Sequence, residues 1–235
     1  MTRRIPVEAM HRSREIEWLE SIFHFSFAGY YNKNNMNFGV LRVVNDDVIR
    51  EHSGFETHPH NDMEIVSYMV RGALTHRDSL GNASTIRRGA VQYMSAGSGI
   101  LHSEINEGDE EVRLLQIWIR PDVKNAPPAY GDYKFPWEGR RNKLLHIAGS
   151  KNGNAPVKLN QDVNMYALEL DSGNTLDVQV AHGRQCYIVQ IEGSSDINGI
   201  TLNERDAMET AQEPLRVTTQ SVSHLLFIEM GLSAA

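Results

Sequence analysis

Four side chains able to bind a metal ion occur as two pairs with the same spacing. His58 and His60 lie two positions apart, and His102 and Glu104 repeat this spacing further along the chain. On an extended strand, residues i and i+2 point to the same side, so each pair can present both side chains to one ion. Three imidazole nitrogens and one carboxylate oxygen suit a borderline divalent transition metal. The spacing therefore predicts one metal site on two neighbouring strands.

The segments around these pairs carry the pattern of β-strands. Short runs with alternating apolar residues, separated by glycine and polar clusters, occupy residues 38–44, 63–70, 90–94 and 112–119. Strands at such even spacing are typical of a sandwich or barrel, so the predicted fold class is all-β. Residues 7–19 come closest to a helical period, and we expect the one helix there.

A proline-rich stretch divides the chain. Four of the eight prolines fall within residues 121–136, and proline lacks the donor that a central strand needs. We therefore predict an N-terminal domain over residues 1–120, a linker over 121–142 and a C-terminal domain over 143–235. Both domains show short strands and turns in a similar order, which suggests one barrel fold used twice.

Composition excludes several classes of protein. The charge is 23 − 30 = −7 and the only cysteine is Cys186, which argues against direct nucleic-acid binding, a disulfide framework and a cysteine-based zinc cluster. The charged N-terminal segment lacks the apolar core of a secretory signal, and no apolar run is long enough to cross a membrane. We expect a cytoplasmic protein without a membrane segment.

Three further positions have interpretations that do not involve binding. We expect His76 to be solvated near a hairpin, with residues 78–82 forming its turn. We interpret residues 45–47, Asn-Asp-Asp, as a turn whose carboxylates could orient an imidazole, and Trp118 as barrel packing.

The two ligand pairs lie in segments that resemble the two sequence motifs of the cupin superfamily. The first motif is represented by Gly54, His58, His60, Glu64 and Gly72. The second is represented by Gly89, Gly97, His102 and Asn106, with two extra residues between Gly97 and His102. More narrowly, the stretches HPHNDMEIVSYMVRG and MSAGSGILHSE are similar to the pirin family. The resemblance is strongest to short bacterial pirin-like proteins with quercetin 2,3-dioxygenase activity.

This resemblance implies a bicupin, which consists of two antiparallel jelly-roll β-barrels packed together, with metal in the N-terminal barrel only. It assigns the ligands to His58, His60, His102 and Glu104. Ordinary cupins instead use the carboxylate of the first motif, here Glu64, so Glu64 stays open as an alternate ligand or as a group that supports the ligands. The expected cofactor is one divalent metal ion, with iron(II) first and nickel, copper, manganese, cobalt and zinc as further candidates.

The resemblance also implies a reaction. The family opens the central ring of flavonols such as quercetin with O₂ and releases carbon monoxide, so the expected ligands are a small aromatic enol and O₂. Glu104 would then be catalytic as well, as a general base for the substrate hydroxyl. Eukaryotic pirins suggest the alternative of a metal-dependent regulator that acts through a protein partner. We expect a monomer.

Overall fold

The computed structural model describes residues 2–232, and these residues are built almost wholly from antiparallel β-strands. The predicted all-β class is confirmed. The helix expected over residues 7–19 is wrong. A short 3₁₀ turn, η1 (Val7–Ala9), is followed by strand β2 (His11–Ile16), which pairs with β3 (Leu19–Phe23). Pairing with a neighbouring strand outweighs a weak helical period. Among the described residues, no helix has the length and apolar character needed to cross a membrane.

The chain folds into two compact units. The N-terminal barrel contains residues 11–135 together with 159–161. The C-terminal barrel contains the described residues 2–10, 136–158 and 162–232. These bounds differ from the expected domains mainly because residues 2–10 belong to the C-terminal barrel, where β1 (Arg3–Ile5) pairs with β20 (Ala207–Ala211).

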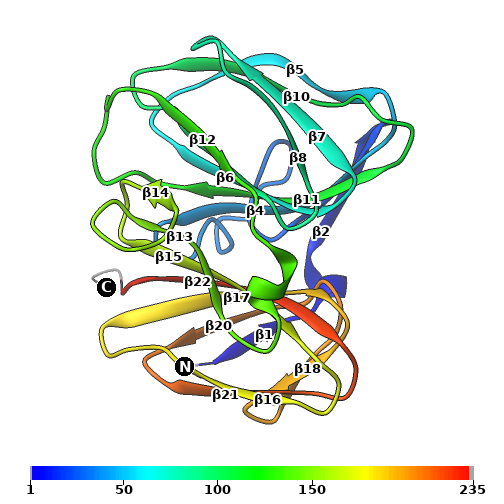
Figure 1. Cartoon of the computed structure of the whole chain (residues 1–235), viewed down its shortest axis with the longest axis vertical. Coiled ribbons are helices and arrows are strands. Elements are labelled where there is room, and N and C mark those ends of the chain that lie inside the picture. The colour runs from blue at the N-terminus through cyan, green and yellow to red at the C-terminus, as the bar shows by residue number, and fades with distance from the viewer. Residues whose placement is uncertain (1, 233–235) are drawn as a thin grey trace. The chain divides into compact units, whose positions relative to one another are not determined.

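The N-terminal barrel consists of a seven-stranded and a four-stranded sheet, and most of its strands are labelled in Figure 1. The larger sheet has the order β12-β9-β6-β11-β4-β3-β2, and its further members are β4 (Leu41–Ile49), β6 (Glu64–Arg71), β9 (Val91–Ser95), β11 (Val112–Ile119) and β12 (Ala129–Tyr133). The smaller sheet has the order β5-β10-β7-β8, formed by β5 (Ser53–His60), β10 (Ile100–Asn106), β7 (Ala73–Asp78) and β8 (Ala83–Arg87).

The stretch expected to be a linker contains regular structure. Strand β12 lies within it and pairs with β9 at the edge of the larger sheet. A second 3₁₀ turn, η2 (Trp137–Arg140), follows. An edge position needs only one partner strand, which is why flanking prolines are tolerated there.

The C-terminal barrel repeats the division into seven and four strands. Its larger sheet has the order β1-β20-β17-β22-β15-β13-β14, with β13 (Leu145–Ser150), β14 (Val157–Leu159), β15 (Val163–Leu170), β17 (Arg184–Glu192) and β22 (Ser223–Gly231). Its smaller sheet has the order β16-β21-β18-β19, formed by β16 (Thr175–Gln179), β21 (Pro214–Thr219), β18 (Ser195–Ile197) and β19 (Ile200–Leu202). The matching sheets support the predicted repeat.

Polar side chains interrupt the apolar interior of the N-terminal barrel. Along β6, Ile65 and Met69 belong to two separate apolar clusters, and Ser67 lies between them on the same face. Neighbouring strands also place a polar residue at this level, and the cross-strand partners form a row that we call the polar belt: Gln92, Ser67, Gln116 and Asn45. All four are buried. Burying polar groups is unfavourable unless they find partners, so the belt marks a place with a use beyond packing.

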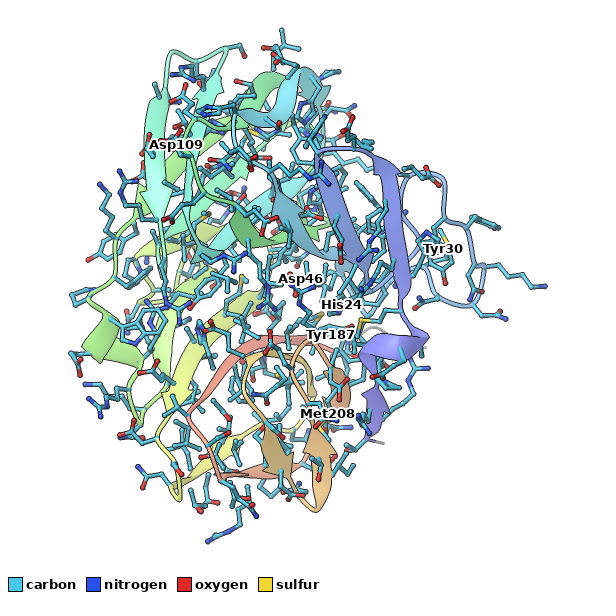
Figure 2. The ribbon with its side chains drawn as sticks, turned by 90° about the vertical axis from the view of Figure 1, so that its right-hand side faces the viewer. His24, Tyr30, Asp46, Asp109, Tyr187 and Met208 are labelled. Atoms are coloured by element: carbon cyan, nitrogen blue, oxygen red, sulfur yellow. The ribbon has the colours of Figure 1, made fainter. Side chains whose placement is uncertain are left out.

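A buried ion pair fixes the strands that carry this belt. Arg113 on β11 donates to both carboxylate oxygens of Asp46 on β4, at 2.9 and 2.8 Å. Figure 2 shows Asp46 in the interior close to His24, and its charge acts on that histidine. Because strand residues alternate, Asp46 points away from the face that carries Asn45 and Asp47. Residues 45–47 therefore form part of a strand, and their interpretation as a turn is wrong.

Candidate metal centre

Three histidines gather where β5 and β10 pair. His58 lies directly opposite His102 in the antiparallel register, and His60 follows on the same side of β5. The ring centroids are 4.5 Å apart for His58 and His102, 4.8 Å for His58 and His60, and 4.9 Å for His60 and His102. One nitrogen from each ring lies within 4.8 Å of the other two. The structure thus brings together the three imidazoles that the doubled spacing predicted.

A glycine allows the two strands to approach. Gly54 at the start of β5 has φ = +157°, and a Cβ built there would lie 2.2 Å from the carbonyl oxygen of Glu104. Any larger residue would push β5 away from β10. The glycine of the first motif therefore sets the separation of the histidine pairs.

The three imidazoles carry lone pairs that suit a cation. The Nδ1 of His58 donates to the carbonyl of Glu56 at 2.7 Å, which leaves its Nε2 as the basic nitrogen. The Nε2 of His102 is buried without a hydrogen-bond partner. Burial and the neighbouring histidines lower the pKa of His60 to about 4 and that of His102 to about 2, so both rings are neutral at pH 7. These residues fit a divalent transition metal.

A second row of side chains supports His102. His76 is fully buried, and its Nε2 donates to the Asp78 carboxylate at 3.1 Å. Its Nδ1 is then an acceptor, for Gln92 Nε2 at 3.1 Å and for His102 Nδ1 at 3.4 Å. With its proton on Nδ1, His102 presents the lone pair of Nε2, which is the tautomer a metal site needs. The expectation that His76 is solvated is wrong.

The hairpin turn at residues 78–82 holds the carboxylate at the base of this row. Asp78 accepts hydrogen bonds from the backbone of Leu80 at 2.9 Å and from the backbone and side chain of Asn82 at 3.0 Å. Burial would raise the pKa of Asp78, but hydrogen bonds from Asn82 and His76 together hold it below its usual value. The predicted turn is confirmed, because residues 78–82 join β7 to β8.

Glu104 belongs to the same strand as His102 but its carboxylate is held by the polar belt. It accepts hydrogen bonds from Ser67 Oγ at 3.0 Å and Gln116 Nε2 at 2.8 Å. Burial raises the pKa of Glu104, although these hydrogen bonds and nearby histidines oppose the rise. Its oxygens lie outside the group of three nitrogens that approach within 4.8 Å. The carboxylate thus sits in the wall beside the histidines.

Glu64 has different partners. Its Oε1 accepts hydrogen bonds from the Tyr93 hydroxyl at 2.6 Å and the Asn160 backbone at 2.7 Å, and its Oε2 accepts one from the Gln161 backbone at 2.9 Å. These contacts fasten residues 159–161 to the N-terminal barrel. Glu64 does not line the cavity beside the histidines. Its hydrogen bonds favour a role for Glu64 in holding residues 160 and 161 against the barrel.

A cavity of about 270 Å³ opens beside the histidines. This volume lies near the lower end of the ~300–1,000 Å³ typical of small-molecule sites. Its apolar wall consists of Ile16, Leu19, Phe23, Phe27, Ala28, Phe55, Ile65 and Trp118. Trp118 meets His60 edge-on, with ring centroids 4.9 Å apart. Trp118 packs against the apolar cluster that contains Ile65 and Ile100, as expected, and it also lines the cavity. The wall suits a compact aromatic ligand.

Comparison with known proteins agrees with this architecture. Residues 6–119 match the Pirin family, and residues 146–230 match the family described as the quercetinase C-terminal cupin domain. The chain is 39% identical over 214 residues to a "Pirin-like protein" of Caulobacter vibrioides, covering 90% of this chain and 92% of that one. It is 37% identical over 215 residues to "Quercetin 2,3-dioxygenase" of Escherichia coli K12, covering 91% and 92%.

A solved structure extends the match to three dimensions. The bacterial pirin YhhW of Escherichia coli in complex with nickel(II) has a TM-score of 0.92 and 33% sequence identity, covering 99% of this chain and 100% of that one. The expected bicupin fold, with one cupin domain in each half of the chain, is therefore confirmed. The ring of histidines, the paired barrels and the matches along most of the chain lead to one conclusion: the chain belongs to the pirin family.

Proposed function

We propose that this protein is a metal-dependent dioxygenase that opens the central ring of flavonols such as quercetin with O₂ and releases carbon monoxide. The observation that carries the proposal is the meeting of three imidazoles and one buried carboxyl group at the wall of an aromatic cavity. The proposed ligands are His58, His60, His102 and Glu104, for one metal ion per chain.

The imidazoles would hold the metal and the cavity would hold the substrate. Bound there, a divalent transition metal lowers the pKa of a coordinated hydroxyl group and supplies the reactivity toward O₂ that side chains lack. Phe23, Phe55 and Trp118 offer flat apolar surfaces for an aromatic ring and exclude water around the reacting group. The protein itself would orient the substrate, exclude water from the cavity and accept one proton.

Glu104 is the residue that we assign to that proton. Its carboxylate lines the cavity, and burial raises its pKa toward the range in which a carboxylate is an effective base. Ser67 and Gln116 each donate a hydrogen bond to one of its oxygens, so the carboxylate is held in one orientation. We propose that Glu104 takes the hydroxyl proton of the enol and also serves as the fourth ligand at some stage.

The relatives support a dioxygenase more than a regulator. The Escherichia coli relative is named for quercetin 2,3-dioxygenase, and the second half of this chain matches a quercetinase cupin domain. The structure of YhhW with nickel(II) supports a divalent metal in this fold. None of these names describes regulation through a protein partner, and we do not propose that alternative.

The test is turnover of quercetin by metal-loaded protein, followed by oxygen consumption and carbon monoxide release in parallel. Iron(II), nickel(II), copper(II), manganese(II), cobalt(II) and zinc(II) should each be loaded and counted. We expect at least one metal to give equal amounts of O₂ consumed and carbon monoxide released. His58→Ala should abolish metal binding and turnover together. Absence of turnover with every metal, at full occupancy, would contradict the proposal.

Glu104→Gln separates base from ligand. The amide is a weak oxygen ligand but takes no proton, so we expect metal retention with a loss of turnover of about 10²–10⁴-fold at matched occupancy. Glu110→Gln, at an exposed position of the same barrel, is the matched control and should keep normal turnover. Full turnover in Glu104→Gln would rule out its assignment as the base.

A further inference from the structure

The side-chain oxygen of one buried amide at the cavity lacks a hydrogen-bond partner among the described residues. Asn45 on β4 is 3% exposed and lines the cavity, and its Oδ1 has no hydrogen-bond partner. A buried acceptor that lacks a donor destabilises the fold, so such groups call for an explanation. Asn45 is also the end of the polar belt beyond Gln116, whose amide is engaged with Glu104. Its oxygen is left for a ligand.

A carboxyl group lies two residues along the same face of the strand. Asp47 is 2% exposed, lines the same cavity and accepts a hydrogen bond from Ser21 Oγ at 2.5 Å. Ser21 is its cross-strand neighbour on β3. Burial, together with the charges of Asp46 and Glu104, raises the pKa of Asp47 to about 7, despite the hydrogen bond from Ser21. In either protonation state a carboxyl group can accept a hydrogen bond from a hydroxyl.

These two side chains and the histidines belong to different sheets. Asn45 and Asp47 come from the seven-stranded sheet, whereas His58, His60 and His102 come from the four-stranded sheet. All five line one cavity. A ligand that reaches from the histidines across this cavity to the larger sheet would meet Asn45 and Asp47.

We propose that Asn45 and Asp47 form a subsite that selects ligands carrying hydroxyl donors at the end remote from the metal. The proposal rests on the proposed function for the placement of an aromatic ligand between the two sheets. Two acceptors on one strand face, in a cavity that Phe23 and Phe27 also line, match a hydroxylated aromatic ring. They mismatch an aliphatic or unsubstituted end, which would leave the acceptors buried without partners.

The test compares two flavonols that differ only at the pendant ring. Quercetin carries two adjacent hydroxyls there, and galangin carries none. Binding to metal-loaded protein is measured without oxygen, through quenching of tryptophan fluorescence, because Trp118 lines the cavity. We expect wild type to bind quercetin at least 10-fold more tightly than galangin. Asn45→Leu and Asp47→Leu, which keep side-chain size, should each shrink that ratio several-fold, and the double variant should abolish it.

Stability and a matched control separate a specificity role from a structural one. Asn45→Leu removes an unpaired acceptor, so its melting temperature should equal or exceed that of wild type. Glu110→Gln, at an exposed position of the same barrel away from the cavity, should leave the ratio unchanged. An unchanged ratio in the Asn45 and Asp47 variants, or equal weakening of both flavonols, would overturn the proposal.

The same experiment distinguishes this inference from the proposed function. Selective binding of quercetin that depends on Asn45 and Asp47, without any turnover in air, would contradict the dioxygenase and leave the subsite standing. If the wild type and the variants turn over both flavonols and all show the same ratio of quercetin to galangin affinity, the dioxygenase is supported and the subsite is contradicted.

Discussion

At the scale of single residues, the orientation of His102 depends on side chains that would not bind the metal. The Nδ1–H of His102 donates a hydrogen bond to His76 Nδ1, and the Nε2–H of His76 donates one to Asp78. Gln92 Nε2 also donates to His76 Nδ1 and shares its lone pair with His102. The bond to Asp78 makes His76 Nδ1 an acceptor, and this favours the tautomer of His102 with its proton on Nδ1. The metal affinity should therefore depend on His76 although that residue is no ligand.

Replacing His76 tests this dependence. In His76→Ala the three ligand imidazoles remain, but His102 loses its acceptor, so we expect metal affinity to fall by about 10–100-fold. Competition with a chromophoric chelator measures the change. His52→Ala, at an exposed histidine of the same barrel, is the control. Equal affinity for the wild type and His76→Ala would show that the row of hydrogen bonds does not orient His102.

Asp47 gives a prediction about pH. Its pKa is about 7 in the folded chain, against an ordinary value of 3.8, because burial and the charges of Asp46 and Glu104 disfavour the ionised form. Between about pH 4 and 7 the unfolded chain has lost the Asp47 proton while the folded chain keeps it. The free energy of unfolding of the wild type therefore falls as pH rises through this range, and the loss is complete at about pH 7. Asp47→Asn has no such proton. The free energy of unfolding of metal-free Asp47→Asn, relative to wild type, should therefore rise by about 3 kcal/mol from pH 5 to 7 and stay level from pH 7 to 8.

Thermal unfolding of both proteins across that range measures the difference. The comparison between variants matters here, because His24 changes the pH dependence of both proteins equally. Burial lowers the pKa of His24 to about 4, so its contribution is lost as pH falls below the ordinary value of 6.5. A difference between Asp47→Asn and wild type that stays constant with pH would mean that Asp47 is ionised throughout.

At the scale of elements, the site depends on the separation of β5 and β10. His58 faces His102 across this pair, and the register shifts between His102 and Glu104. On the other side of β10, the register places His76 of β7 opposite Glu104. Strand β10 thus carries His102 and Glu104, and it pairs with β5 on one side and with β7 on the other. Its position is fixed at the point where Gly54 meets its backbone.

Gly54→Ala should disturb both fold and site. The added Cβ meets the Glu104 carbonyl oxygen, so we expect a loss of about 2–4 kcal/mol in the free energy of unfolding and weaker metal binding. Chemical denaturation and metal titration measure the two effects. Gly81→Ala, whose glycine has φ = +89° and open space around it, should lose only about 1 kcal/mol and keep the metal. Similar losses for both variants would show that the close approach is unimportant.

At the scale of the whole molecule, the two barrels have the same arrangement of sheets, but the cluster of three histidines lies in the N-terminal barrel. Each barrel has a seven-stranded and a four-stranded sheet. In the part of the chain that the structure describes, the histidines at positions 58, 60 and 102 are the one group of three ligand residues close enough to share an ion. His224, in the C-terminal barrel, is buried and pairs with Glu192 at 3.0 Å.

We therefore expect metal loading to saturate at one ion per chain. His182→Ala combined with His224→Gln should leave this stoichiometry unchanged, because neither residue belongs to a group of ligands. Elemental analysis of the folded, loaded protein measures it, and His58→Ala with its loss of metal is the positive control. Two ions per wild-type chain would show a second site in the C-terminal barrel.

The sequence alone determined the features that depend on local chain geometry. A strand places residues i and i+2 on one side, so the pairs at positions 58 and 60 and at 102 and 104 predicted side chains that face one way. The turn at residues 78–82 follows from its own residue types in the same manner. The all-β class and the repeated barrel came from patterns that recur along the chain.

Only the tertiary structure decided which polar side chains gather around the histidine cluster. Ser67, Gln92 and Gln116 each interrupt an apolar strand, which is a signal that the sequence did contain, but the register of pairing was needed to join them into a belt. His76 and Asn45 became part of the site because distant strands buried them. Burial and strand pairing depend on residues that are far apart in the sequence, whereas the alternation of side chains along a strand depends only on adjacent residues. The cluster of three histidines was therefore readable in the sequence, and the buried polar side chains around it were not.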